Sequence, residues 1–141
     1  MRVVIGVAMT AAVLTSLASP AQAGTFRRTV PPGHCRTVHG RMAIYNGTFS
    51  FRIWAIGTHR MLRVVDREGD NFDDVERFPP TLAGALRPFK EDLWGLPVFA
   101  DFKVCDFTES LPGVMQSITV EGARHIRVSG DRENASGHSP P

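Results

Sequence analysis

The chain has 141 residues, with 16 Lys and Arg against 14 Asp and Glu, and a formal net charge of +2 at pH 7. This near balance makes any bulk electrostatic attraction to nucleic acid weak, so a function that depends on cations must be local to one surface. The length suits a single domain with a modest core and leaves too few residues for a second.

The N-terminus has the pattern of a secretory signal peptide over residues 1–23. Behind a single arginine, an apolar run from Val3 to Leu17 is followed by Ala21 and Ala23, the small-residue ending at which such leaders are cut. The run is too short to span a bilayer comfortably. We expect cleavage, a periplasmic or secreted product and no membrane span after it; an uncleaved anchor and a buried helix are the alternatives.

The two cysteines of the chain are Cys35 and Cys105. An exported protein meets an oxidising compartment, in which such a pair closes into a disulfide. The rival interpretation is a metal site in the segment HCRTVH, with His34, Cys35 and His39 as ligands. That spacing is not a recognised zinc pattern, and a disulfide would remove the second thiolate that a soft metal needs. We expect the disulfide and no cofactor.

Residues 24–34 have no hydrophobic period and contain a proline pair, which predicts an irregular lead-in. The pattern then becomes alternating, with Val38, Met42 and Ile44 on one side of a strand and Arg41 on the other. A period of two is the signature of a half-buried strand. The inward face of this first strand therefore begins at Val38.

The dipeptide Asn-Gly at residues 46–47 is the strongest hairpin signal in the chain, because both residues tolerate the positive φ of a type I′ turn. A two-residue turn there pairs Met42 with Phe51. The apolar side of the second strand, TFSFRIWAI, then meets the apolar side of the first. The same register places Arg41 opposite Arg52.

A second tight turn is predicted at residues 57–58, with glycine in the first central position, as type II′ turns prefer. It again places apolar residues opposite apolar residues, and it pairs Arg52 with Arg63. The stretch from about 36 to 65 is therefore expected to form a three-stranded meander.

The rest of the chain is predicted to contain an acidic loop, one helix, two strands and a polar tail. Pro80 can open the helix, because amides of the first helical turn need no partner, and Pro88 ends it. The acidic loop fails as a calcium-binding loop at Asn71 and Arg77. We expect an exposed loop at 66–76, a helix near 80–88, strands at 97–107 and 114–122, the last extended or bent at Gly122, and disorder over 130–141.

This order of elements is that of the five-stranded OB-fold barrel, with its helix between the third and fourth strands. Gly40, midway along the first strand, suits the bend that such a barrel needs. The first and fourth strands of the barrel run antiparallel, so Cys35 and Cys105 would lie near each other on the outward phase. We predict an OB-fold-like barrel over residues 35–129, closed by one disulfide; other small β-barrels and a sandwich are the alternatives.

In the predicted register, Arg41, Arg52 and Arg63 form a row on the face away from the core. Like charges directly opposite one another are destabilising by up to about 1 kcal/mol per pair. Three explanations stay open. Carboxylates of the acidic loop, or Glu91 and Asp92, fold over the row; water screens the splayed side chains; or an anionic ligand binds the guanidinium groups.

Aromatic neighbours favour a ligand. Trp54 has the outward phase and is predicted to pair with His39 on one side and Met61 on the other, while Tyr45 lies near the hairpin tip. Aromatic residues beside arginines on the second and third strands occupy the face with which OB-folds bind oligonucleotides and oligosaccharides. We predict a binding surface that consists of Arg41, Arg52, Arg63, Trp54, His39, Tyr45 and Met61.

The sequence contains no recognisable catalytic motif. G-x-S-x-G, glycine-rich phosphate loops, HExxH and C-x-x-C are all absent. Asp101 and Glu121 could meet on adjacent strands as paired carboxylates for acid and base catalysis, but solvated positions, or partners of Lys103 and Arg124, explain them better. We expect no enzymatic activity.

The segments GRMAIYNGTFSFRIWAIGTHRML and DFKVC resemble a pattern found in small, uncharacterised exported bacterial proteins. The resemblance covers roughly residues 35–126 and departs from that pattern at Asp106, where a proline is expected. It implies export and a compact β domain, but it transfers no activity, cofactor or catalytic residue.

The first functional hypothesis is therefore an exported, non-enzymatic binding or accessory module whose outer face engages an anionic ligand or polymer. The alternative is a structural envelope protein that docks a partner protein through an apolar patch of Trp54 and Met61, with the arginines paired internally. A hydrolase that carries no recognisable motif is the second alternative. We expect a monomer in each case.

Overall fold

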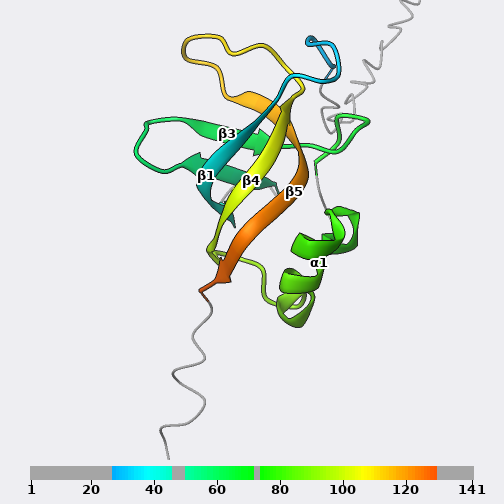
Figure 1. Cartoon of the computed structure of the whole chain (residues 1–141), viewed down its shortest axis with the longest axis vertical. Coiled ribbons are helices and arrows are strands. Elements are labelled where there is room, and N and C mark those ends of the chain that lie inside the picture. The colour runs from blue at the N-terminus through cyan, green and yellow to red at the C-terminus, as the bar shows by residue number, and fades with distance from the viewer. Residues whose placement is uncertain (1–26, 46–49, 72–73, 130–141) are drawn as a thin grey trace, which may run out of the picture.

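The computed structural model describes residues 27–45, 50–71 and 74–129 (Figure 1). The predicted signal peptide, the Asn-Gly turn at 46–47 and the tail at 130–141 lie outside these residues. No helix in the described part is long and apolar enough to cross a membrane. In chain order the elements are β1 (Cys35–Ile44), β2 (Phe51–Ala55), β3 (Met61–Val64), the 3-10 helix η1 (Val75–Arg77), α1 (Pro80–Leu86), the 3-10 helix η2 (Arg87–Phe89), β4 (Val98–Asp106) and β5 (Gln116–Val128).

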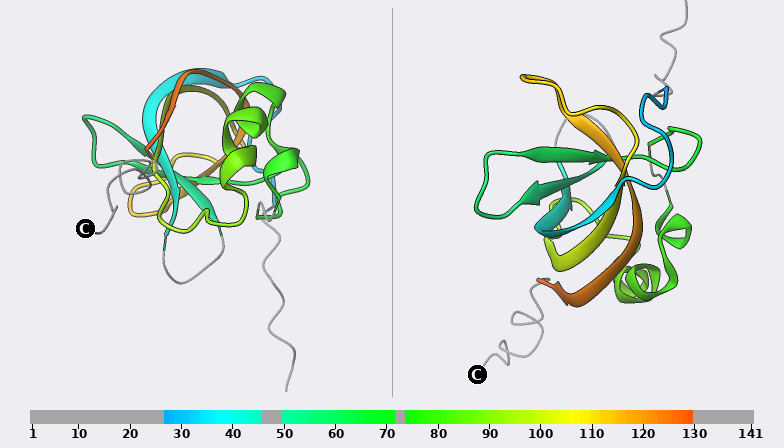
Figure 2. Two further views of the ribbon diagram at one scale, coloured as in Figure 1. Left: turned by 90° about the horizontal axis from the view of Figure 1, so that it is seen from below. Right: turned by 45° about the horizontal axis from the view of Figure 1, so that its top comes forward.

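The strands form a closed barrel in the order β1-β2-β3-β5-β4, and Figure 2 shows the ring that they enclose. All neighbouring pairs are antiparallel except β3 and β5, which run parallel. The helix α1 lies outside the barrel, on the side away from the β2–β3 loop (Figure 1). The predicted mostly-β fold, a five-stranded barrel with one short helix between the third and fourth strands, is confirmed.

Alternation along the strands fills the barrel interior. Met42, Ile53, Leu62 and Phe102 are buried members of one hydrophobic cluster, to which α1 adds its own apolar side chains. Gly40 lies where β1 and β2 approach closely: a Cβ there would be 2.5 Å from Cγ2 of Ile53. Glycine at this position therefore permits the close approach of the two strands.

The disulfide is confirmed. Cys35 and Cys105 are direct partners in the β1–β4 ladder, and their sulfur atoms are 1.97 Å apart. Because Cys35 is consumed by this bond, the rival metal site, which needed its thiolate, is wrong. The bond ties the first strand of the barrel to the fourth across a sequence separation of 70.

The register of the first hairpin differs from the prediction by two residues. Met42 pairs with Ile53, and Arg41 pairs with Trp54. Side chains alternate with a period of two, so a shift of two residues keeps every apolar residue inside the barrel, and the hydrophobic pattern cannot distinguish the two registers. The predicted row of three arginines is consequently wrong: Arg52 lies opposite Ala43.

The register of the second hairpin is confirmed, because Arg52 pairs with Arg63. The turn type is not. Thr58 N donates to Ala55 O at 3.1 Å, so Gly57, with φ of 80°, is the second central residue of the turn. That geometry belongs to a type II turn rather than to type II′.

The acidic segment 66–76 is less exposed than predicted. Asp66 is only 6% exposed. One of its carboxylate oxygens accepts hydrogen bonds from the backbone N–H groups of Glu68 and Asp70, at 3.0 and 2.8 Å, and the other pairs with Arg77. The helix expected near 80–88 is confirmed, and its final turn is the 3-10 helix η2.

Candidate functional site

The outer surface of β1, β2 and β3 brings together a cation, an indole and a thioether. Arg41 is the ladder partner of Trp54, and Trp54 is the ladder partner of Met61. All three face outward because they alternate with inward residues of their strands. The predicted pairing of Trp54 with Met61 is confirmed, whereas its predicted pairing with His39 is wrong.

The same row continues around the barrel. Arg41 also pairs with Phe99 on β4, and Phe99 pairs with Arg127 on β5. Cationic and aromatic side chains therefore alternate across neighbouring strands. We call the set Met61, Trp54, Arg41, Phe99 and Arg127 the cation–aromatic row. Phe99 and Arg127 were not predicted, because the β1–β4 and β4–β5 registers are not encoded in any single stretch of sequence.

An open hollow of about 600 Å³ lies beside Trp54. We call it the Trp54 hollow; its walls are Arg41, Tyr45, Trp54, Gly57, Thr58, His59 and Met61. The indole Nε1 donates to Thr58 O at 2.8 Å, while the side chain stays 38% exposed. One edge of the ring is thus held by the protein, and a ring held in this way is suited to stacking.

Arg41 supplies the positive charge of this hollow. Its side chain is half-buried. Among the residues that the structure describes, no carboxylate forms an ion pair with it, and no acidic residue lines the hollow. The structure thus brings four of the predicted site residues, Arg41, Tyr45, Trp54 and Met61, to one concave surface.

Arg52 and Arg63 form a separate, half-buried pair one row away. Burial, and to a smaller extent the charge of Arg52, lowers the pKa of the Arg63 guanidinium. Both arginines also interact with other groups of the protein. The ion pairs of Asp66 and Glu68 go to Arg77. Arg52 and Arg63 therefore differ from Arg41, which forms no ion pair with a carboxylate of the described residues.

His39 belongs to a third group, with Asp101 and His125. Asp101 is the ladder partner of His39, and its two carboxylate oxygens lie 2.7 Å from Nδ1 of His39 and 2.7 Å from Nδ1 of His125. An ionised carboxylate only accepts hydrogen bonds, so each imidazole donates. The bonds from His125 and His39 hold the pKa of Asp101 below its usual range.

A β-bulge in β5 makes this group possible. The β4–β5 register shifts between Phe99 and Asp101, and His125 has a φ of 53°, the one positive value among the described residues other than glycine. Such a conformation costs of order 1 kcal/mol and persists only where other contacts hold it. Asp101 and Glu121 are not ladder partners: Asp101 lies opposite Arg124, and Glu121 forms an ion pair with Arg67 at 3.1 Å.

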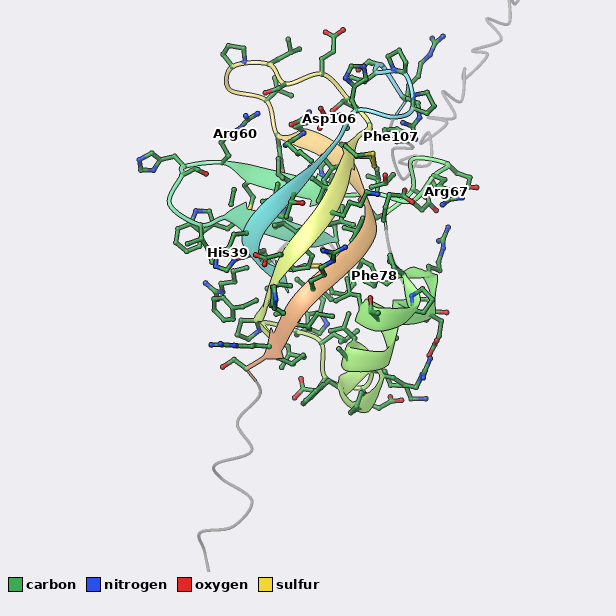
Figure 3. All side chains as sticks on the ribbon, in the orientation of Figure 1. His39, Arg60, Arg67, Phe78, Asp106 and Phe107 are labelled. Atoms are coloured by element: carbon green, nitrogen blue, oxygen red, sulfur yellow. A yellow bond between two sulfur atoms is a disulfide. The ribbon has the colours of Figure 1, made fainter. Side chains whose placement is uncertain are left out.

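A second concave surface, which the sequence did not indicate, lies between the β2–β3 and β4–β5 loops. It has a volume of about 480 Å³ and includes His59, Met61 and the loop residues Leu111 and Val114. We call it the Leu111 cleft. Arg60 points from the start of β3 toward the β4–β5 loop, where it donates to Ser110 Oγ (Figure 3). Residues 107–113, which were predicted only as a loop, carry no local signal for this contact.

Comparison with protein-family models, with curated proteins and with solved structures finds no match for this chain. A barrel of this architecture can host many unrelated functions. Functional inference must therefore come from the chemistry of the outer face.

Proposed function

We propose that the protein is an exported, non-enzymatic binding module that engages an anionic partner at the Trp54 hollow. The observation that carries this proposal is the pairing of Arg41 with Trp54 in a concave surface that no carboxylate of the described residues lines. A guanidinium group recognises carboxylates and phosphates through paired hydrogen bonds. The neighbouring indole offers an apolar face to whatever carries that anion.

The overall charge balance supports a local site. With a net charge of +2 the chain has little long-range attraction for polyanions. The cation–aromatic row can supply such a local attraction, because Arg41 and Arg127 are free of ion pairs with the described carboxylates. We take the barrel to be an OB-fold, whose second and third strands form the usual binding face.

Export is the second component of the proposal. The N-terminal pattern of residues 1–23 is that of a secretory leader. The Cys35–Cys105 disulfide is of the kind that forms in the periplasm or outside the cell. The partner would then be an anion of the envelope or of the extracellular space.

A titration of Trp54 fluorescence tests the binding site. The chain has two tryptophans, so Trp94→Phe leaves Trp54 as the sole indole reporter. The probes are an oligothymidylate and a short polyglutamate, each at several salt concentrations. We expect Arg41→Glu to weaken binding by roughly tenfold or more, the order expected for a hydrogen bond to a charged group, and binding to weaken as salt rises.

Lys103→Glu is the matched control. Lys103 is an exposed cation of β4 that lines neither the Trp54 hollow nor the Leu111 cleft. Its reversal changes the net charge by the same amount, so it should alter affinity far less than Arg41→Glu. Equal losses in both variants would mean unspecific charge attraction and would contradict the proposed site. Binding that ignores salt and survives Arg41→Glu would favour the apolar docking alternative.

A further inference from the structure

The Trp54 hollow and the Leu111 cleft are neighbours. Both are lined by His59 and Met61, so one concave surface passes into the other along the start of β3. The β2–β3 and β4–β5 loops, which frame the cleft, project from the same side of the barrel, away from α1 (Figures 1 and 2). A partner long enough to leave the Trp54 hollow on this side would enter the Leu111 cleft.

The walls of the two surfaces differ in chemistry. The Trp54 hollow has the rings of Trp54 and Tyr45, whereas the cleft contains Leu111, Pro112 and Val114 in addition to two methionines. Leu111 is 53% exposed and Val114 is 61% exposed. Exposed aliphatic side chains gathered beside a groove are typical of surfaces that bind proteins.

This difference separates the classes of anionic partner. The bases of a nucleic acid and the rings of an acidic polysaccharide could stack on Trp54, but neither polymer carries an aliphatic side chain to bury against Leu111 and Val114. A polypeptide carries both carboxylates and aliphatic side chains. Among anionic polymers, a peptide therefore uses both surfaces best.

Charge points to an acidic peptide. Among the residues that the structure describes, Arg41, His59 and Arg60 are the basic residues that line the two surfaces, and no aspartate or glutamate lines either. The Arg60 guanidinium donates a hydrogen bond to the hydroxyl group of Ser110. Because a hydroxyl group is neutral, this bond does not neutralise the positive charge of Arg60. Carboxylates of a partner would complement the positive charges of Arg41 and Arg60.

The closed barrel restricts the mode of binding. Its strands pair with one another all the way around. Strand addition requires an unpaired sheet edge, and at the Trp54 hollow β2 is paired on both sides, with β1 and with β3. Recognition of a peptide must then come from its side chains, placed in pockets.

We infer that the anionic partner is an extended acidic segment of another protein, which sets a carboxylate beside Arg41 and buries an aliphatic side chain in the Leu111 cleft. This inference rests on the function proposed above and names the class of partner. It assigns the β4–β5 loop, with Leu111 and Val114, to the binding surface.

The test uses the full mature chain with Trp94→Phe and peptides of about twelve residues, roughly 40 Å long when extended at about 3.3 Å per residue. One peptide alternates Glu and Leu, the second replaces Leu by Ser, and the third replaces Glu by Lys. We expect the Glu/Leu peptide to bind at least about tenfold more tightly than the Glu/Ser peptide, the difference expected for burial of one leucine. The Lys peptide should not bind.

Substitutions in the Leu111 cleft show whether the leucine side chains of the peptide bind there. The double substitution Leu111→Ser and Val114→Ser should remove the advantage of the Glu/Leu peptide and leave the affinity for the Glu/Ser peptide unchanged. Both residues are exposed, so circular dichroism and the unfolding midpoint should match those of the parent. Ile56→Ser is the control, because Ile56 is an exposed apolar residue that lines neither surface.

The outcomes separate this inference from the proposed function. If the double variant keeps the Glu/Leu advantage, or if an oligothymidylate or an oligogalacturonate binds more tightly than any peptide, a peptide partner is excluded while the Trp54 hollow remains a site for anions. If no anionic probe responds to Arg41→Glu, the proposed function fails, and this inference fails with it.

Discussion

Arg41 on β1 lies directly opposite Trp54 on β2, two positions from the partner that a two-residue turn would give it. The distinction matters because the two registers make different surfaces. The predicted register stacks three arginines in one row, whereas the observed register sets a guanidinium group beside an indole and leaves Arg52 paired with Arg63.

Engineered cysteines can test this register. Direct cross-strand partners have Cβ atoms about 5 Å apart, whereas diagonal neighbours are about 7–8 Å apart, beyond the reach of a disulfide. We expect Arg41→Cys with Trp54→Cys to form a second disulfide, and Arg41→Cys with Arg52→Cys to leave two free thiols. Mass spectrometry of non-reduced peptides identifies the bonds. A disulfide between the cysteines at 41 and 52, with free thiols at 41 and 54, would instead support the register with three arginines in one row.

The close approach of β1 and β2 predicts a sensitive glycine. In Gly40→Ala the new methyl group would lie 2.5 Å from Cγ2 of Ile53 and 3.1 Å from the carbonyl oxygen of Trp54. We expect the free energy of unfolding to fall by about 1–3 kcal/mol, the usual cost of overpacking. Urea unfolding measures it.

Gly84 provides the control for that measurement. It lies within α1, and a Cβ there would meet nothing within 4 Å. Alanine has a higher helix propensity than glycine, so Gly84→Ala should raise the free energy of unfolding by about 0.5–1 kcal/mol. A loss of stability at this position would contradict the described helix.

The disulfide should contribute substantially to stability. Replacement of both Cys35 and Cys105 by alanine removes a covalent link between residues separated by 70 in the sequence. The chain-entropy model gives a loss of about 4 kcal/mol, since the unfolded state is no longer constrained. Chemical unfolding of the variant, and of the parent protein with and without reductant, measures this loss. An unchanged midpoint in all three samples would show that the bond does not constrain the unfolded chain.

The pH dependence of the Asp101 group follows from its hydrogen bonds. His125 and His39 lower the pKa of the Asp101 carboxyl in the folded state. A lowered folded-state pKa means that these bonds stabilise the fold above the unfolded-state pKa and that this stabilisation is lost as the pH falls through the folded-state pKa. An NMR titration of the Asp101 carboxyl group should show the lowered pKa directly.

Substitutions at the histidines assign the cause. His125→Gln and His39→Gln should each raise the pKa of Asp101 toward its ordinary value, with the larger change for His125, whose hydrogen bond is the larger contribution. His59→Gln removes a histidine that does not bond to Asp101 and serves as the control. An Asp101 titration that is the same in all three variants would rule out this hydrogen-bonded group.

Asp66 should be far more important for stability than an exposed carboxylate. Its side chain is 6% exposed, and it pairs with Arg77 in addition to accepting two backbone hydrogen bonds. Because Asp66→Ala leaves the partner groups unsatisfied, we expect a loss of about 3 kcal/mol in the free energy of unfolding. Glu76→Ala removes the exposed ion pair with Arg87 and should cost much less. Similar losses in the two variants would mean that Asp66 is solvated.

Local sequence patterns were sufficient to predict the phases of the strands and much of the architecture. Alternation of apolar residues, such as Val38, Met42 and Ile44, assigned the inward face of β1, because the side-chain period of a strand is a local property. The proline pair before Thr81 marked the start of the helix. The order of the elements, together with two cysteines on matching phases, predicted the barrel and its disulfide.

Which outward residues became neighbours could not be predicted from local patterns and depended on the three-dimensional pairing of the strands. A slip of two residues between β1 and β2 changes neither the phase nor the burial of any core residue, so Arg41 could be assigned to Trp54 only in three dimensions. A bulge in β5 brought His125 to Asp101, and two distant loops met to bring Leu111 near Met61. Local periodicity fixes which face a side chain takes, whereas contacts between segments far apart in the chain depend on how the whole barrel closes.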